Sequence, residues 1–376
     1  MSTPKIKIRT GNQMIAEGAL YAGCRFFAGY PITPASGIYK TMIEELPKHG
    51  GVAISAPDEI SALAYCVGAS ARGVKAMTAT SGPGWSLMIE TVQYALMTEL
   101  PVVIAVVQRL GPSTGGATQS AQGDVLFTEF CTSGAYTIPI FAPSTPQECF
   151  EVTTLAVYWS EALRTPVVIL SDKEIGMTAE DVDVTSLKPF EVNYRKQIEH
   201  GDDYKTYGFS NLADVPLFAA VGSNHKTTIT GSAHDKCGTL QKNSSETIEV
   251  LKHLQAKISA RAQDMEYVKL DDEPHADILL ISFGITARTA REAVRLLRAQ
   301  GRTIRLANVI SLFPIPEKTL QNAAQGVRTV VVAEENLTGQ YRSVIQHLFP
   351  DKRVESINTI GRMITPEMIL SVVNTL

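Results

Sequence analysis

Hydroxyl-bearing residues follow a short apolar segment near the start of the chain. Cys24–Ala28 predicts a buried strand that ends at Gly29, and residues 30–36 then read Tyr-Pro-Ile-Thr-Pro-Ala-Ser. Each proline fixes its own φ and disfavours helix at the residue before it, so this loop is stiff and presents Thr33 and Ser36 where the strand ends. Open α/β sheets bind ligands at the carboxyl ends of their strands. The alternative is an ordinary turn in which Ser36 caps the following helix.

An arginine stands between another apolar strand and a glycine-rich loop. Val102–Gln108 predicts the strand, and Arg109 is followed by Leu-Gly-Pro-Ser-Thr-Gly-Gly. Glycines let the backbone approach a ligand closely, and a planar guanidinium can hold a carboxylate through two hydrogen bonds. Arg109 is therefore a candidate carboxylate-binding residue, and a surface arginine in a solvated loop is the alternative.

Two further segments place polar groups at the start of helices. Residues 57–62, Pro-Asp-Glu-Ile-Ser-Ala, follow a strand and open an alanine-rich helix. Asp58 suits an N-cap, whereas Glu59 either favours the helix dipole or is buried for chemistry. Residues 80–84, Thr-Ser-Gly-Pro-Gly, resemble a phosphate-cradling turn, because glycines and a helix N-terminus form an anion site. This turn is too short for a P-loop, and no lysine follows it.

Together with Gly11-Asn12-Gln13, these motifs resemble one family. The chain is similar to the alpha subunits of the 2-oxoacid:ferredoxin oxidoreductases. Those thiamine-diphosphate enzymes decarboxylate 2-oxoacids onto coenzyme A and pass electrons to ferredoxin. The resemblance is specific from Gly11 to Thr178 and looser from Ala276 to the end.

The resemblance implies roles for particular residues. Glu59 matches the catalytic glutamate that hydrogen-bonds the aminopyrimidine ring and promotes loss of the C2 proton. The substrate carboxylate would contact Thr33 and Arg109, with Ser113 and Thr114 as further substrate contacts. The cofactor-binding residues implied are Tyr30, Pro31, Ile32, Thr33, Glu59, Ser81 and Gly82.

The resemblance also implies partners. A beta subunit would carry the diphosphate site, Mg²⁺ and a [4Fe–4S] cluster, because the acidic Gly-Asp-Gly motif for the metal is not found in this chain. The substrate implied is 2-oxoglutarate, with pyruvate or a branched-chain 2-oxoacid as alternatives, and the reaction can run in either direction. Ferredoxin and coenzyme A would be the other partners, in a dimer of heterodimers. A stand-alone thiamine-diphosphate enzyme and a non-catalytic regulatory subunit are the competing hypotheses.

Composition limits the other possibilities. The net charge of -4 and the pI near 6.0 give no basic footprint for nucleic acid. The longest apolar stretches are strand-sized, and residues 1–8 lack the apolar core of a signal peptide, so we expect a cytoplasmic protein. Five cysteines without a CxxC pair argue against a cluster held by this chain.

Alternating strands and helices predict an α/β fold with a doubly wound parallel sheet. We expect a pyrimidine-binding thiamine-diphosphate domain over residues 1–187, an extended connector over 188–265, and a smaller transketolase C-terminal-like domain over 266–376. The connector should end in a charged amphipathic helix, Ser245–Arg261, that spans between domains or touches a partner. Glu334-Glu335 and Asn336 end the last strong strand, where either a subunit contact or a solvated turn is expected.

Overall fold

The computed structural model describes residues 4–192, 194–199 and 203–376; the parts of the expected first domain and connector at 1–3, 193 and 200–202 lie outside the described residues. The larger sheet has seven strands in the order β12-β6-β7-β5-β4-β2-β3. Its strands are β2 (Phe26–Gly29), β3 (Val52–Ser55), β4 (Ala76–Thr80), β5 (Val102–Gln108), β6 (Ile140–Phe141), β7 (Pro166–Asp172) and β12 (Ser311–Phe313). All neighbouring pairs are parallel except β12 with β6.

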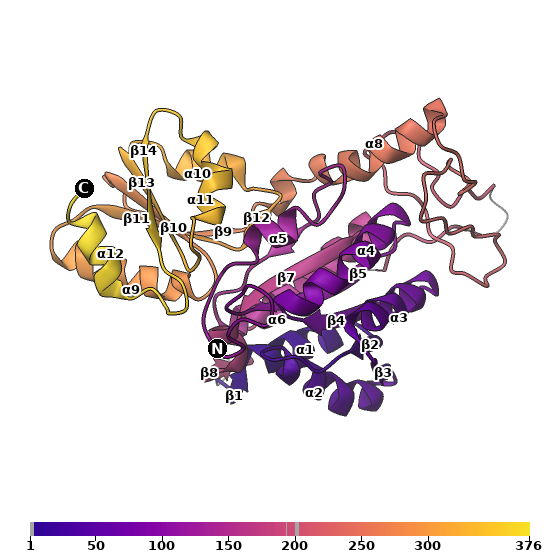
Figure 1. The fold of residues 1–376 in the computed structure, drawn as a ribbon, viewed down its shortest axis with the longest axis horizontal. Coiled ribbons are helices and arrows are strands. Elements are labelled where there is room, and N and C mark those ends of the chain that lie inside the picture. Colours follow the sequence, from indigo (N-terminus) through magenta and orange to yellow (C-terminus); the bar gives the residue numbers. More distant parts are fainter. Residues whose placement is uncertain (1–3, 193, 200–202) are drawn as a thin grey trace.

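Helices cover both faces of this sheet (Figure 1). They are α1 (Gly11–Tyr21), α2 (Ser36–Glu45), α3 (Glu59–Ala71), α4 (Gly82–Met97), α5 (Val125–Glu129), α6 (Pro146–Leu163) and α7 (Lys173–Met177). Alternate residues of β5 point into different cores, since Val102 and Ile104 pack with α3 and α4 whereas Val103 and Ala105 pack with α1 and α6. A separate antiparallel ribbon pairs β1 (Ile6–Thr10) with β8 (Ala179–Asp183).

The strand order creates a switch point between β2 and β4. From β2 the chain moves outward to β3, and it then returns to the other side of β2 to form β4. Connections from β2 and β4 therefore leave in opposite directions, and the crevice between them opens at their carboxyl ends. The predicted doubly wound sheet is confirmed, and this crevice is where the loops after β2, β3 and β4 meet.

Helix α4 begins earlier than the sequence indicates. The sequence predicts a turn over residues 80–84, whereas the helix already starts at Gly82, because Pro83 lies in its first turn. Ser81 is the N-cap residue but its side chain makes no cap hydrogen bond. The apparent phosphate-cradling loop is therefore mostly the first turn of a helix. At α2 the N-cap is Ala35, so the alternative of a Ser36 cap is wrong.

The connector has no helix or strand among its described residues between β8 and α8 (Ser245–Ser259). Its loops lie at the end of the larger domain away from the second domain (Figure 1). Helix α8 is fixed to the larger domain by a buried cluster in which Lys257 Nζ lies 2.6 Å and His253 Nε2 3.1 Å from Glu99 Oε2. The connector itself is held by the buried pair Arg195 and Glu161, at 2.8 Å.

The second domain is a five-stranded sheet in the order β14-β13-β10-β11-β9. Its elements are β9 (Val268–Asp271), β10 (Ile278–Ser282), α9 (Thr286–Ala299), β11 (Ile304–Val309), α10 (Glu317–Ala323), β13 (Thr329–Glu334), α11 (Gln340–Ile345), β14 (Arg353–Asn358) and α12 (Pro366–Val373). Gly301 follows α9 with φ 84°, as expected for a helix-ending glycine.

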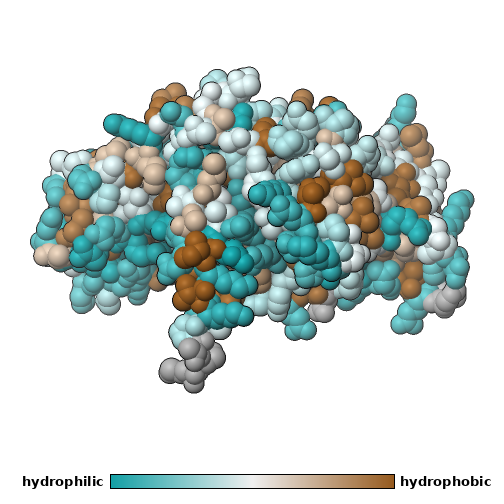
Figure 2. Space-filling view, turned by 90° about the horizontal axis from the view of Figure 1, so that it is seen from below, coloured by the Kyte–Doolittle hydropathy of each residue, from teal (hydrophilic) through white to brown (hydrophobic). Residues whose placement is uncertain are grey.

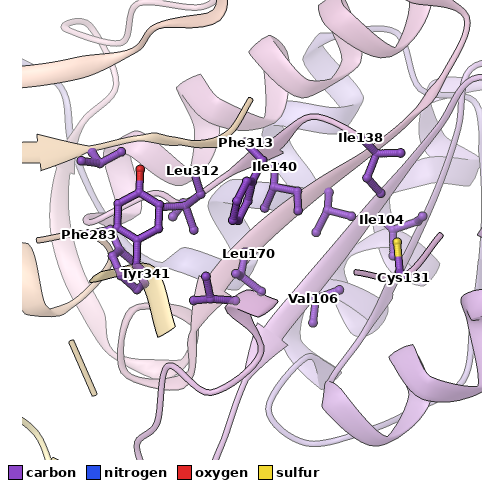
Figure 3. Packing of buried hydrophobic residues seen from close by; sticks show 14 of the residues in the cluster. Ile104, Val106, Cys131, Ile138, Ile140, Leu170, Phe283, Leu312, Phe313 and Tyr341 are labelled. Carbon is purple, nitrogen blue, oxygen red and sulfur yellow. The ribbon is translucent and has the colours of Figure 1, made fainter. Parts of the chain in front are cut away.

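The two domains share one apolar core. Strand β12 crosses from the second domain to pair with β6, and Leu312 and Phe313 pack beside Ile140 (Figure 3). Phe283 and Tyr341 of the second domain belong to the same cluster, with ring centroids 5.5 Å apart. The domains are therefore joined by packed side chains as well as by the connector.

A polar seam lies beside this core. Glu334 and Glu335 are fully buried, so the expectation of a solvated turn is wrong. Ser120 Oγ is within hydrogen-bonding distance of Glu335 Oε2 and lies 3.0 Å from Glu174 Oε2. A hydroxyl has one proton to donate, so Ser120 can donate to only one of these two carboxyl groups at a time. Burial raises the pKa of Glu335, and the nearby Glu174 raises it further.

None of the helices in the described part of the chain is long and apolar enough to cross a membrane. Cys24, Cys66, Cys131 and Cys149 are buried free thiols, and Cys237 is exposed. In the space-filling view, apolar side chains form separate patches among hydrophilic ones (Figure 2).

Replacing Glu335 by Gln should flatten the dependence of stability on pH. The pKa of an unfolded glutamate is about 4.3. Because the folded pKa of Glu335 is higher, the contribution of this group to stability is complete below the unfolded value and is lost as pH rises through the folded value. The loss approaches about 1.4 kcal/mol per pH unit between the two values. Glutamine stays neutral, can accept from Ile364 N as Glu335 does, and can donate to Ser120. Urea denaturation at pH 5 and pH 8 measures the difference.

The matched control is Glu334→Gln. Both carboxylate oxygens of Glu334 accept from backbone N–H groups, those of Tyr341 and Arg342, each at 2.9 Å. An amide would turn its NH₂ toward one of these donors, so this variant should be less stable at both pH values. Equal pH dependence in Glu335→Gln and wild type would contradict a proton held at Glu335.

Candidate functional site

The first element of the site is a buried carboxylate at the start of α3. Glu59 is the first residue of the helix and is 6% exposed. Asp58 is the N-cap, and its side chain accepts a hydrogen bond from Ser61 N at 2.7 Å. The sequence prediction that Asp58 caps the helix is confirmed. Among the described residues the Glu59 carboxylate has no hydrogen-bond partner, although the helix dipole favours its negative charge.

Glu59 lies against the first turn of α4. A Cβ atom at Gly84 would come within 2.6 Å of Glu59 Oε1 and 2.1 Å of Thr80 Oγ1, so this position requires glycine. On the other side of the turn, a Cβ at Gly82 would be 3.1 Å from both carboxylate oxygens of Asp124. The first turn of α4 is therefore packed between two carboxyl groups.

The polar atoms around this turn are not satisfied within the chain. Ser81 Oγ and Asp124 Oδ2 are both buried and have no hydrogen-bond partner. Burial raises the pKa of Asp124 to about 6, and the positive charge of Arg109 opposes this shift. Unsatisfied buried polar groups are costly, and a ligand with donors and acceptors can satisfy them. The turn therefore has the properties of a binding site.

Arg109 ties together the loops after β2 and β5. Its guanidinium donates from Nη1 to Thr33 O and from Nη2 to Thr114 O, the latter at 3.2 Å. Arg109 Nε is buried without a partner. A guanidinium has five N–H donors, so donors remain for a carboxylate after both backbone contacts are made. Arg109 is 8% exposed, and the alternative of a solvated surface arginine is wrong.

A cavity of about 270 Å³ opens beside the loop after β2. Asn12 lines it and donates from Nδ2 to Pro34 O at 2.8 Å. Its Oδ1 atom is buried and has no partner. Asn12 therefore supports the loop that carries Thr33.

Comparison with known proteins identifies the family. Residues 17–250 match the thiamine-diphosphate-binding domain of pyruvate flavodoxin/ferredoxin oxidoreductase, and residues 276–369 match core domain II of pyruvate:ferredoxin oxidoreductase. The 2-oxoglutarate synthase subunit KorA of Methanocaldococcus jannaschii is 37% identical over 95% of this chain and 96% of its own length. This chain belongs to the 2-oxoacid:ferredoxin oxidoreductases.

Solved structures agree with this assignment. The 2-oxoglutarate:ferredoxin oxidoreductase from Magnetococcus marinus, with 2-oxoglutarate, coenzyme A and succinyl-CoA bound, matches with a TM-score of 0.93 and 30% identity. The match covers 99% of this chain and 65% of that longer chain. A split-gene transketolase, an inactive beta4 tetramer, matches at 13% identity with a TM-score of 0.58 and shows the shared fold.

The fold of the present chain brings some of the predicted site residues together and leaves others apart. Thr33, Arg109 and Thr114 are linked by the guanidinium, and Ser81 and Gly82 lie in the turn beside Glu59. The side chains of Ser113 and Thr114 are exposed, as are Tyr30 and Pro31, whereas Ile32 is half-buried. No direct contact joins Glu59 to Arg109 among the described residues.

Sequence reasoning missed two residues of this region of the oxidoreductase chain. Asp124 was not considered, because it lies 15 positions after Arg109 and only the fold brings it to Gly82. Asn12 was noted within the Gly11-Asn12-Gln13 motif without a role. Its place at the start of a helix could be read from the sequence. Its hydrogen-bond acceptor, Pro34 O, lies 22 positions away and could not.

Replacing Gly84 by Ala should destabilise the oxidoreductase chain and displace Glu59. The new methyl group would overlap Thr80 Oγ1 and the Glu59 side chain, and such overpacking costs about 1–3 kcal/mol. Gly68, in the interior of α3, provides the control because a Cβ there meets nothing within 4 Å. Gly68→Ala should stabilise by about 0.5–1 kcal/mol. Urea denaturation midpoints of the two variants should move in opposite directions, and a shift in the same direction would contradict the packing.

Proposed function

We propose that this chain is the alpha subunit of a 2-oxoacid:ferredoxin oxidoreductase that acts on 2-oxoglutarate. The reaction is oxidative decarboxylation with coenzyme A to an acyl-CoA, CO₂ and reduced ferredoxin, or its reverse. The observation that carries the proposal is the buried, unpartnered Glu59 carboxylate at the switch point of the sheet. The named relatives support 2-oxoglutarate as the substrate.

The residues at the switch point suit the aminopyrimidine end of thiamine diphosphate. When bound, this cofactor supplies the carbanion chemistry that the side chains lack. Glu59 would hold or exchange a proton with a ring nitrogen of the pyrimidine. Ser81 Oγ and the first turn of α4, which includes Gly82, would contact the ring. Tyr30, Pro31, Ile32 and Thr33 would form the side of the pocket after β2.

Arg109 would bind the carboxylate of the 2-oxoacid. Its remaining N–H donors and the Thr33 hydroxyl would hold the carboxylate between the loops after β5 and β2. Ser113 and Thr114 would contact the rest of the substrate. Both residues are exposed, so they would meet the substrate from the loop surface. Pyruvate or a branched-chain 2-oxoacid in the same enzyme class remains the second candidate.

A beta subunit would complete the site. Several elements that start at the carboxyl edge expose apolar side chains there: Tyr30 after β2, Ile60 in α3, Leu87 in α4, and Phe127 and Phe130 in and after α5. Exposed apolar surface is typical of protein interfaces, and we propose that the beta subunit covers these side chains. We assign the diphosphate, Mg²⁺ and a [4Fe–4S] cluster to the beta subunit, within a cytoplasmic dimer of heterodimers.

The domain limits are part of the proposal. The pyrimidine-binding domain would span residues 1–187, the connector 188–265 and the transketolase C-terminal-like domain 266–376. The absence of regular elements between β8 and α8 in the described residues supports the first limit. The ion pairs that hold the connector against the larger domain make it a fixed part of that domain's surface.

The test is 2-oxoacid-dependent reduction of a viologen dye in the presence of coenzyme A and thiamine diphosphate. It compares the isolated chain with its complex with the beta subunit, on 2-oxoglutarate, pyruvate and 2-oxoisovalerate. Activity that requires the complex and is fastest on 2-oxoglutarate is the expected result. Activity of the isolated chain, or no activity of the complex with any 2-oxoacid, would contradict the proposal.

Replacing Glu59 by Gln should reduce turnover of the complex by about 10²–10⁴, because glutamine cannot exchange the proton. Asp58→Asn is the matched control: it removes the neighbouring carboxylate and retains an N-cap side chain. The control should keep wild-type turnover in the viologen assay. A regulatory subunit with a degenerate pocket predicts instead that Glu59→Gln leaves activity unchanged.

Replacing Arg109 by Lys should weaken substrate binding more than turnover. Lysine keeps the positive charge but cannot form the two-pronged contact, and a charge-assisted hydrogen bond contributes about 1.5–3 kcal/mol. We expect the KM for the 2-oxoacid to rise at least about tenfold, with the KM for coenzyme A unchanged. Equal changes in both KM values would indicate a general disturbance of the loop.

A further inference from the structure

Asp124 occupies a position that the proposed function does not use. Its backbone N–H donates to Gln108 Oε1 at 3.0 Å. This hydrogen bond fixes Asp124 at the carboxyl end of β5. Its carboxylate straddles Gly82, the first residue of α4. Asp124 thus lies at the same sheet edge as Arg109 and on the opposite side of the α4 turn from Glu59.

We propose that Asp124 takes up a proton when the 2-oxoacid binds, so that substrate and proton enter the site together. This inference rests on the proposed function, because it needs a carboxylate substrate at Arg109. The proton comes from solvent and joins one carboxylate oxygen of Asp124. It returns to solvent after the carboxylate has left as CO₂, so the proton balance of the overall reaction is unchanged.

The charges around Asp124 explain this coupling. Arg109 is the cation that faces it, and burial opposes ionisation strongly enough to raise the pKa of Asp124 to about 6. An incoming carboxylate would share the charge of Arg109 and bring a second negative charge close to Asp124. Like charges in a poorly hydrated crevice disfavour ionisation, so binding favours the protonated acid.

Three other side chains near Asp124 do not supply the positive charge that Arg109 provides. Glu59 lies across the α4 turn and adds negative charge on that side. Asp172 is reached through Gln108, whose Nε2 donates to Asp172 Oδ1 at 3.0 Å. Burial raises the pKa of Asp172 well above its usual range. From α11 the neighbouring side chain is the uncharged Gln340, which binds the Gly123 carbonyl.

Asp124 Oδ2 also has a geometric reason to hold the proton. It is buried and has no hydrogen-bond partner in the chain. A protonated carboxyl group can donate a hydrogen bond to a substrate oxygen, whereas a carboxylate could only repel it. Asp124 would therefore change from a repelling to a donating group as the substrate enters.

The kinetic test is the KM for 2-oxoglutarate in the complex with the beta subunit between pH 5.5 and 8.5. If binding requires protonated Asp124, the KM should rise up to about tenfold per pH unit above pH 6, whereas kcat should not follow this profile. Asp124→Asn is neutral at every pH and keeps an N–H donor, so its KM should be flat over the same range. Parallel profiles in wild type and Asp124→Asn would overturn the inference.

Glu129→Gln is the matched control. Glu129 is another carboxyl group whose pKa burial raises, to about 7, but it lines a different cleft, between α8 and α10. This variant should keep the wild-type KM profile. A flat profile in Glu129→Gln as well would mean that the pH dependence does not come from Asp124.

A measurement without turnover separates this inference from the proposed function. Difference infrared spectra of the isolated chain should contain a protonated-carboxyl band that disappears with a midpoint near pH 6 and is missing in Asp124→Asn. Identical spectra for the two proteins would overturn the proton site itself. A titrating band in a complex that turns over no 2-oxoacid would overturn the proposed function and leave the proton site standing.

Discussion

The site depends on the parallel pairing of β4 with β2 on one side and β5 on the other. This pairing brings the ends of the strands to one edge, so that the first turn of α4 lies between residues that follow β3 and residues that follow β5. The turn can fit there because two of its residues are glycines, each packed against a carboxyl group. The burial of Glu59 and the placement of Asp124 near Arg109 both follow from this packing.

Among the described residues, the buried carboxylates at this edge have no side-chain partner, unlike Glu99. Glu99 has Lys257 and His253 as partners, and its interactions fix α8 against the larger domain. Glu59 and Asp124 are surrounded in a similar way but lack such partners. Removing one partner of a buried ion pair is costly, so Glu99 is tied to Lys257 and His253, whereas Glu59 and Asp124 have no such partners to lose.

Local sequence patterns predicted the strands well because each strand is a short, nearly continuous apolar run. The bounds of β5 agree with the sequence prediction, and Asp58 caps α3 as expected. The start of α4 was placed too late, because Gly82 and Pro83 are typical of both a loop and a first helical turn. Local pattern alone does not distinguish a loop from a first helical turn here, because Gly82 packs against a carboxylate from a distant segment.

The features that sequence could not give are all long-range. Strand β12 is three residues long and becomes a strand through pairing with β6, more than 160 positions earlier in the chain. Glu335 is buried because Ser120 and the Ile364 backbone close around it. Gln122 then joins the two regions, since it donates to Asp172 and accepts from the backbone N–H of Glu335. A chain of hydrogen bonds thus runs from Asp124 through Gln108, Asp172 and Gln122 to the second domain, so the second domain helps to fix the position of the loop that carries Arg109.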